Sequence, residues 1–260
     1  MALLVDVHSH LDHPSLYKKL DEVITNAKNH EINAIITSGI DFESNRKALE
    51  ISKRFDIVKC SLGIYPVDAL KKETTDVYKY KPFNIDEEIE FIKQNKDNII
   101  AIGEIGLDYV ASNDKEKSEQ KQLFQRMLTL AETIKKPVII HSRKAEAEVV
   151  DIIETSKLKK IVMHCFSGKF KLVKRIADKG WFFSIPTNIV RAQNFQKMAM
   201  EVPLSQILTE TDAPYLSPFR HKINEPAHII ETIKTIAEIK KMDVVEVKNN
   251  IYFNYQKVFL

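Results

Sequence analysis

The sequence predicts an α/β protein that folds as a single (β/α)8 barrel, on two observations. Short, nearly continuous apolar runs alternate with longer amphipathic stretches, and this alternation occurs eight times along the 260 residues. Such a run is typical of a parallel strand buried on both faces, and parallel strands need crossovers of a dozen or more residues. Eight units of about 32 residues each suit a barrel of about 250 residues.

The strands are expected where the apolar runs are shortest and most continuous. Strands of this kind do not alternate between apolar and polar residues, because helices cover both faces of the sheet. In chain order the expected strands are residues 3–8, 34–38, 58–62, 99–104, 137–141, 161–164, 181–185 and 207–209.

Helices are expected between these strands, where apolar residues recur at three- and four-residue spacing. In the first of them, Leu20, Val23, Ile24 and Ala27 fall on one face. The last two helices follow the eighth strand and close the chain. In order, the expected helices are residues 16–29, 44–55, 85–95, 116–134, 144–155, 170–179, 189–200, 227–240 and 244–258.

An open, doubly wound sheet is the alternative architecture. Its first strand would lead into the Gly-x-Gly-x-x-Gly turn of a dinucleotide-binding fold, and the sequence has no such turn there. The polar, lysine-rich stretch 68–84 is expected to be a long βα loop rather than a linker. Residues 1–260 are therefore expected to form one domain.

The composition is that of an ordinary globular protein, with 44% hydrophobic and 29% charged residues. No apolar run approaches the ~18 residues that span a bilayer, and the N-terminus lacks the basic region of a signal peptide. Two cysteines, Cys60 and Cys165, cannot supply a disulfide framework for this length, which favours a reducing compartment. We therefore expect a cytoplasmic protein that does not enter membranes. The net charge of +3 neither requires nor excludes a nucleic-acid partner.

Metal-binding side chains stand at or just after the ends of five predicted strands. Alone, each histidine could be a satisfied interior residue, and each carboxylate could cap the following helix. In a parallel barrel, however, all strands end on one face, where the loops build the active site. The first two histidines are also two residues apart on a strand, so their side chains leave the same face. The expected metal ligands are His8, His10, Glu104, His141, His164 and Asp212.

Six ligands exceed what one catalytic ion takes, because a working site keeps a position for water or substrate. Two divalent ions use them better, with Glu104 as the bridge, since a carboxylate offers one oxygen to each ion. Such a pair activates water and stabilises the attacking and leaving oxygens, which suits hydrolysis of a phosphodiester. Four imidazoles favour zinc or manganese over magnesium, which prefers oxygen ligands.

Five motifs resemble those of the TatD family of metal-dependent deoxyribonucleases, a branch of the amidohydrolase-like barrels. They occur in the family's order and cover nearly the whole chain. The resemblance implies 3′-to-5′ exonuclease activity on DNA with divalent metal, commonly described as magnesium. The motifs are DVHSHLD at 6–12, GEIGLDY at 103–109, HSR at 141–143, HCFSG at 164–168 and ETDAPYL at 210–216.

The resemblance also implies a role for each matching residue. The two N-terminal histidines and Asp212 would hold one ion, and Asp212 would orient or deprotonate the attacking water. The second ion would lie between His141 and His164, with Glu104 shared by both. Asp108 resembles a group that holds a histidine ligand from behind.

One departure from the family pattern follows the third strand. The family usually has Gly-x-His-Pro, and here residues 63–66 read Gly-Ile-Tyr-Pro, so Tyr65 replaces the histidine. A phenol can donate a hydrogen bond to phosphate, but it carries no positive charge near neutral pH. If Tyr65 assists the leaving group, it must therefore do so differently from a histidine. Alternatively, it would stack on a base of the substrate or pack within its own loop.

Four residues are expected to contact the substrate. Arg143 follows a predicted histidine ligand and could bind a phosphate through two N–H groups, or could instead pair with Asp108 or Glu104. Ser167 precedes a helix whose N-terminal amides could receive an anion. Arg220 and Asn224 lie in the last loop, beside the final metal ligand.

Three functions compete. The first is a DNase that acts on single strands or 3′ ends, and nothing in the sequence requires a protein partner. The second keeps the barrel and metals but cleaves an ester or amide, as in deacylation of aminoacyl-tRNA. A carboxylated lysine often bridges the metals of amidohydrolases, so Glu104 at that position favours the first. The third is a nucleic-acid-binding protein with a vestigial site, and the intact set of six ligands argues against it.

Overall fold

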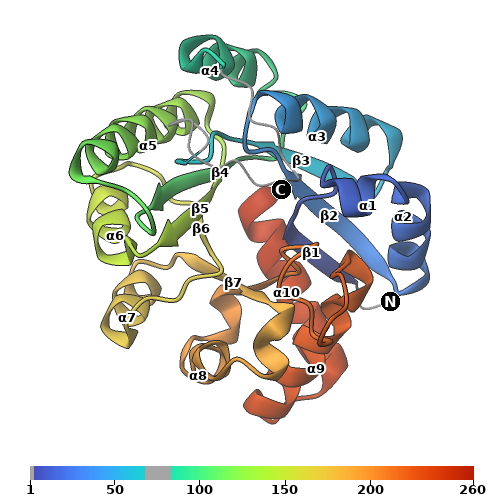
Figure 1. The fold of residues 1–260 in the computed structure, drawn as a ribbon. Coiled ribbons are helices and arrows are strands. Elements are labelled where there is room, and N and C mark those ends of the chain that lie inside the picture. The colour runs from blue at the N-terminus through green and yellow to red at the C-terminus, as the bar shows by residue number, and fades with distance from the viewer. Residues whose placement is uncertain (1–2, 68–82) are drawn as a thin grey trace.

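The computed structural model describes residues 3–67 and 83–260 and has eight parallel strands that pair in sequence order (Figure 1). The predicted (β/α)8 barrel is confirmed. The strands are β1 (Leu4–Ser9), β2 (Ile32–Ser38), β3 (Val58–Leu62), β4 (Ala101–Asp108), β5 (Val138–Arg143), β6 (Ile161–His164), β7 (Phe182–Pro186) and β8 (Ile207–Glu210).

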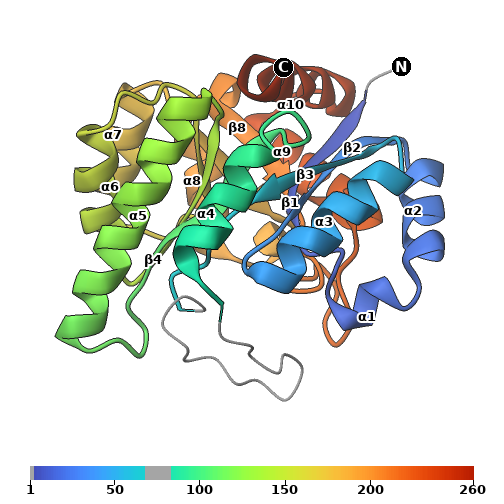
Figure 2. The ribbon, with the colours of Figure 1, turned by 90° about the horizontal axis from the view of Figure 1, so that it is seen from above.

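Helices surround the barrel, and α10 packs on β1 and β8 at the end where the strands begin (Figure 2). No helix within the described ranges is both long enough and apolar enough to cross a bilayer. The α-helices are α1 (Pro14–Tyr17), α2 (Leu20–Asn29), α3 (Phe42–Arg54), α4 (Ile85–Gln94), α5 (Asp114–Ile134), α6 (Glu146–Glu154), α7 (Phe170–Asp178), α8 (Gln193–Glu201), α9 (Ile229–Lys240) and α10 (Val244–Phe259).

The largest differences between the predicted and observed elements occur in three places. The first predicted helix divides into α1 and α2, and the seventh divides into a 3-10 turn (Thr187–Val190) and α8. The fourth strand continues beyond its predicted end to Asp108, which places that carboxylate on β4 itself. The predicted loop over residues 68–84 lies almost entirely outside the described residues.

The strands are buried on both faces, as their continuous apolar sequences predict. Every residue of β1 and every residue of β4 is buried, including the polar ones. Trp181 is only 5% exposed and belongs to the core, where the largest buried side chains include Phe124, Phe166 and Phe183. Polar side chains in such an interior must be hydrogen-bonded or must bind an ion.

Side chains join the last strand to the first and so complete the barrel. Asp6 on β1 accepts hydrogen bonds from the backbone N–H of Thr211 at 2.9 Å and from its hydroxyl at 2.5 Å. Burial raises the pKa of Asp6 to about 8, although these hydrogen bonds act in the opposite direction. The backbone N–H of Asp212 donates to the carbonyl of His8 at 2.9 Å. The join between β8 and β1 therefore brings residues 8 and 212 together.

Candidate metal centre

The six predicted metal ligands meet at the carboxyl end of the barrel, around a cavity of about 270 Å³. They come from the ends of five strands or from the residues that follow them, His8 and His10 both from β1, so the barrel geometry positions them. His8 lies beneath the others and is fully buried. The cavity is lined by His10, Ile40, Tyr65, Glu104, His141, Arg143, His164, Asp212 and Tyr215.

One group of possible ligands consists of His8, His10 and Asp212, whose ligand atoms all lie within 4.8 Å of one another. The Nε2 atoms of the two histidines are 3.3 Å apart. The same atoms lie 3.7 and 3.5 Å from Oδ1 of Asp212. The grouping expected for the first ion is thus present as a set of mutually facing atoms.

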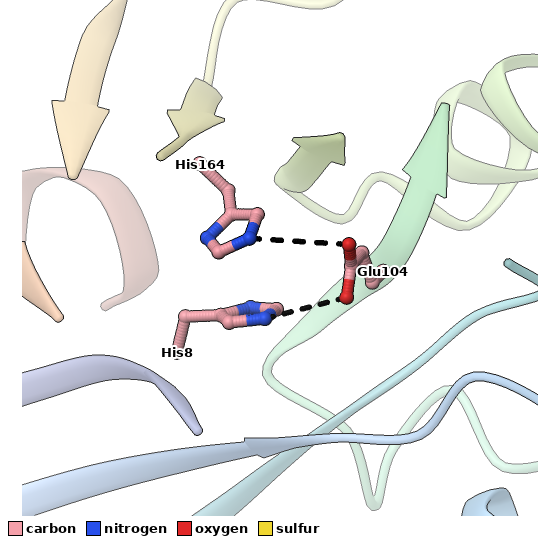
Figure 3. Close-up of side chains that lie close together, drawn as sticks. All are labelled: His8, Glu104 and His164. Carbon is pink, nitrogen blue, oxygen red and sulfur yellow. Dashed lines mark ion pairs between the residues drawn. The ribbon is translucent and has the colours of Figure 1, made fainter. Parts of the chain in front are cut away.

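A second group consists of His8, Glu104 and His164, again within 4.8 Å (Figure 3). Oε2 of Glu104 is 3.3 Å from Nε2 of His8, and Oε1 is 3.9 Å from Nε2 of His164. The two imidazole rings stack, with their centroids 3.8 Å apart. Glu104 therefore presents a different oxygen to each histidine, as a bridging carboxylate would.

His141 lies beside these groups and belongs to neither. Its Nδ1 is 2.8 Å from Oε1 of Glu104, and its Nε2 is 3.1 Å from Oδ2 of Asp108. His141 and His164 are expected to hold the second ion together. Their ring centroids are 6.2 Å apart, and both rings face Oε1 of Glu104, which lies between them. Asp108 holds His141 from behind in the manner that the sequence suggested.

The buried histidines respond in opposite ways to their surroundings. Burial and the neighbouring charge of His164 lower the pKa of His8. Burial also lowers the pKa of His10, but the hydrogen bond with Asp212 and the charge of Glu104 outweigh it and raise the value to about 9. At neutral pH the metal-free site therefore combines a neutral imidazole with cationic ones.

The two carboxylates of the site remain ionised, although Glu104 is buried and Asp212 is partly buried. Burial alone would raise the pKa of Glu104, but hydrogen bonds with His141 and His8 hold it well below its usual value. For Asp212, the hydrogen bond with His10 and the positive charges of the histidines likewise overcome burial and lower the pKa. Both side chains can accept protons or bind a cation at neutral pH.

This donor set fits divalent metal ions. Imidazole nitrogens with carboxylate oxygens are the ligands of zinc, manganese and iron sites. The two Nε2 atoms of His8 and His10 face each other at 3.3 Å, so at most one of them can carry a proton toward the other. A cation bound between the imidazoles and the ionised carboxylates would accept the lone pairs of both Nε2 atoms. These residues are therefore suited to hold a cation.

The metal-free protein should lose stability as the pH rises from 6.5 toward 10. His10 and His164 have pKa values raised to about 9 and about 10, so the folded state retains protons that the unfolded chain releases near pH 6.5. Their contribution is complete below pH 6.5 and is lost as the pH passes through 9 to 10. Thermal melts in EDTA should give a Tm lower at pH 9.5 than at pH 6.5, by on the order of 5 °C.

Metal-saturated protein provides the control for this pH dependence. Protons compete with metal for the same nitrogens, so metal binding tightens as the pH rises and should offset the loss. An EDTA-treated sample whose Tm does not change between the two pH values would contradict the assignment of charged His10 and His164.

Two residues that hold the histidines were not identified from the sequence. Ser38 contacts both N-terminal histidines: its hydroxyl lies 3.1 Å from Nδ1 of His8, and its carbonyl lies 3.2 Å from Nδ1 of His10. Glu210 lies 2.8 Å from Nδ1 of His164. A signal for Glu210 existed, because it directly follows the eighth predicted strand and opens the ETDAPYL motif at 210–216.

The residues expected to contact the substrate have different surroundings. Arg143 is exposed, lines the cavity and forms no ion pair within residues 3–67 and 83–260. Tyr65 also lines the cavity, and its hydroxyl donates to Oδ2 of Asp108 at 2.7 Å. Ser167 is exposed outside the cavity lining and donates to Glu146 at 3.3 Å. Arg220 is exposed in the last loop and does not line the cavity either.

Asn224 does not line the cavity, although a substrate contact is predicted for it. It is fully buried, and its amide nitrogen donates to the hydroxyl of Thr187 at 2.8 Å and to the carbonyl of Thr211 at 2.7 Å. Its amide oxygen accepts from the backbone N–H of Glu225 at 3.1 Å. With both ends of the amide occupied, Asn224 fastens the last loop to the barrel.

Comparison with known proteins gives consistent results. Residues 5–260 match the family model described as TatD related DNase. An uncharacterized metal-dependent hydrolase of Methanocaldococcus jannaschii is 36% identical over 98% of this chain and 96% of its own length. The deoxyribonuclease TATDN3 of Homo sapiens is 33% identical over 98% and 94%. A TatD homologue from Escherichia coli shares the fold, with a TM-score of 0.86 and 23% identity over 98% and 97% of the two chains.

Proposed function

This chain belongs to the TatD family of metal-dependent hydrolases, and we propose that it is a deoxyribonuclease that removes nucleotides from DNA in the 3′-to-5′ direction with two divalent ions. The observation that carries the proposal is the position of Glu104. Its two oxygens face different histidines within one buried cluster at the base of the cavity. The name of the human relative supports DNA as the substrate.

We assign one ion to His8, His10 and Asp212, and the second to His164 with Glu104, beside His141. Bound there, divalent ions would lower the pKa of water and stabilise negative charge on phosphoryl oxygens. Magnesium, manganese and zinc are the candidate ions. The donor set of nitrogens and oxygens supports zinc or manganese more than magnesium.

The protein's own side chains supply proton transfer and orientation. Asp212 lines the cavity as an ionised carboxylate, so its oxygens can accept a proton from an attacking water molecule. Asp108 accepts from Tyr65 and contacts His141, which fixes the plane of that imidazole. Glu104 is 4% exposed and so has little contact with bulk water, whereas Asp212 is open to the cavity.

The cavity also supports the proposed mode of cleavage. Its volume of about 270 Å³ is at the small end of ligand pockets, which favours one nucleotide end over the middle of a duplex. Arg143 on its wall has N–H groups that can bind the phosphate. These two features support an exonuclease that accepts a single-stranded 3′ end.

The proposal can be tested with single-stranded DNA labelled at its 5′ end. Stepwise shortening that stops on addition of EDTA would support it. A p-nitrophenyl ester and an aminoacyl-tRNA, assayed in parallel, represent the ester-hydrolase alternative, and cleavage of these substrates alone would replace the proposal. Binding of DNA without cleavage of any substrate in saturating metal would indicate a vestigial site.

Replacing Arg143 by alanine should raise KM for DNA by about tenfold or more, with a smaller effect on kcat. The loss of a hydrogen bond from a charged group costs roughly 1.5–3 kcal/mol, which corresponds to this factor. Steady-state kinetics on a short oligonucleotide provide the measurement. Lys144→Ala is the matched control, because Lys144 is the exposed neighbour and does not line the cavity. Equal KM values for the two variants would exclude a phosphate contact by Arg143.

Replacing Tyr65 by histidine should raise the rate of DNA cleavage. A histidine at this position can carry the positive charge and the exchangeable proton that a phenol lacks, and it can still bond to Asp108. Tyr65→Phe serves as the comparison, since it removes only the hydroxyl. Single-turnover rates measured from pH 6 to 8 would show the gain for the histidine variant. An unchanged rate throughout that range would contradict a leaving-group role at this position.

A further inference from the structure

Behind His164 lies a buried carboxylate that pairs with no lysine or arginine in the described part of the chain. Glu210 ends β8 and is 0% exposed. Its Oε2 lies 2.8 Å from Nδ1 of His164 and accepts a hydrogen bond from the hydroxyl of Ser184 at 2.5 Å. Its Oε1 accepts from the backbone N–H of Cys165 at 3.0 Å. Both carboxylate oxygens are therefore engaged.

The chemistry of these contacts determines which nitrogen of His164 carries a proton. The oxygens of Glu210 already accept hydrogen bonds from Ser184 and from the N–H of Cys165, and Nδ1 of His164 is likewise the donor in its contact with Oε2. A histidine that binds a metal ion is a neutral imidazole, and with its proton on Nδ1 the lone pair of His164 would be on Nε2. That Nε2 atom is the one that faces Oε1 of Glu104. Glu210 thus directs the lone pair of His164 toward the second group of possible ligands.

Glu210 also holds the backbone that carries His164. Strand β6 ends at His164, and the next residue, Cys165, turns the chain with a φ of 44° in the left-handed region. The N–H that Glu210 accepts belongs to Cys165 at this turn. The ring and the main chain of residues 164–165 are consequently fixed by the same carboxylate.

We propose that Glu210 is a positioning residue for the group formed by His8, Glu104 and His164, and that it sets the metal affinity of this group by fixing the tautomer of His164. The inference rests on the metal centre of the proposed function. Asp212 lies two residues further along but belongs to the other group, with His8 and His10. Loss of the Glu210 carboxylate should therefore weaken one metal position and spare the other.

Zinc titration of the metal-free protein by calorimetry tests this selectivity. Glu210→Gln keeps the shape of the side chain but places an N–H₂ group among three donors. We expect one of the two zinc equivalents to bind 10- to 100-fold more weakly, as for other residues that hold metal-binding histidines. The other equivalent should bind with wild-type affinity. Ser184→Ala is the matched control, because it removes one bond to Glu210 and leaves the bonds of Glu210 to His164 and Cys165 in place, and it should bind both equivalents within about threefold of wild type.

Nitrogen-15 NMR of the zinc-loaded wild-type protein tests the tautomer directly and needs no variant. His164 should show a protonated Nδ1 and a metal-bound Nε2, and the reverse assignment would overturn the proposal. Wild-type affinity of Glu210→Gln for both equivalents would overturn it as well. If Glu210→Gln does not fold, the wild-type spectrum decides alone. Failure of the wild-type protein to bind zinc would instead refute the metal centre of the proposed function.

Discussion

Replacing Glu104 by glutamine should reduce DNA hydrolysis by at least about a thousandfold while the barrel remains folded. Glutamine has nearly the same shape, but it is neutral and offers one acceptor oxygen where the carboxylate offers two. Glu104 contacts His8, His141 and His164, so one substitution removes the charge that all three share. A thousandfold loss corresponds to about 4 kcal/mol of transition-state stabilisation. Initial rates on labelled single-stranded DNA in saturating manganese give the measurement, and Glu104→Ala should behave alike.

Glu154→Gln is the matched control for this experiment. Glu154 is a carboxylate of α6 that pairs with Arg175, and it takes no part in the cavity. Its replacement should leave the rate unchanged. Circular dichroism melts of both variants would separate loss of chemistry from loss of structure. Full activity of folded Glu104→Gln would refute the bridging role of Glu104 and, with it, the dinuclear site.

Replacing Gly106 by alanine should destabilise the fold by roughly 3 kcal/mol or more and displace the strand that carries His141. Gly106 on β4 pairs with His141 on β5, and its φ is 148°, a conformation that residues with a side chain rarely adopt. An added Cβ would lie 1.9 Å from the carbonyl oxygen of His141, far inside contact distance. Because that neighbour is backbone, neither strand can yield without breaking the sheet. Urea denaturation provides the free energy of unfolding.

Gly180→Ala separates the two causes of the expected loss of stability, which are the positive φ and the clash of the added Cβ. Gly180 also has a positive φ, of 75°, but a Cβ there would meet no atom within 4 Å. It should cost only the conformational term, about 1–2 kcal/mol. A cost for Gly106→Ala no larger than that for Gly180→Ala would contradict the clash with His141.

The alternation of apolar runs predicted the fold because each strand is buried on both faces and each crossover is helical. The same logic predicted the convergence of the metal ligands, since the ends of parallel strands share one face of a barrel. Periodicity could not reveal the break between α1 and α2, where both segments continue one amphipathic pattern past Lys18. The break lies at Lys18 and Lys19, and Lys19 begins α2 without a side-chain capping hydrogen bond, so no capping residue in the sequence marks it.

The residues that surround the ligands were harder to predict, for a physical reason. A polar side chain in a loop has no periodicity to show whether it faces the cavity or turns inward, so the sequence could not show that Asn224 is buried. Glu210 was overlooked because its importance depends on His164, 46 positions away in sequence. For Tyr65 the sequence left three roles open, and its contact with Asp108 adds a fourth, that of bracing the carboxylate that holds His141.

The join between β8 and β1 also has a consequence for how the protein matures in the cell. His8 and His10 are synthesised about 200 residues before Asp212. A nascent chain therefore cannot capture a metal ion between these three residues until its eighth strand has emerged from the ribosome and docked against the first. A metal ion would therefore bind at that position only in chains whose barrel has closed.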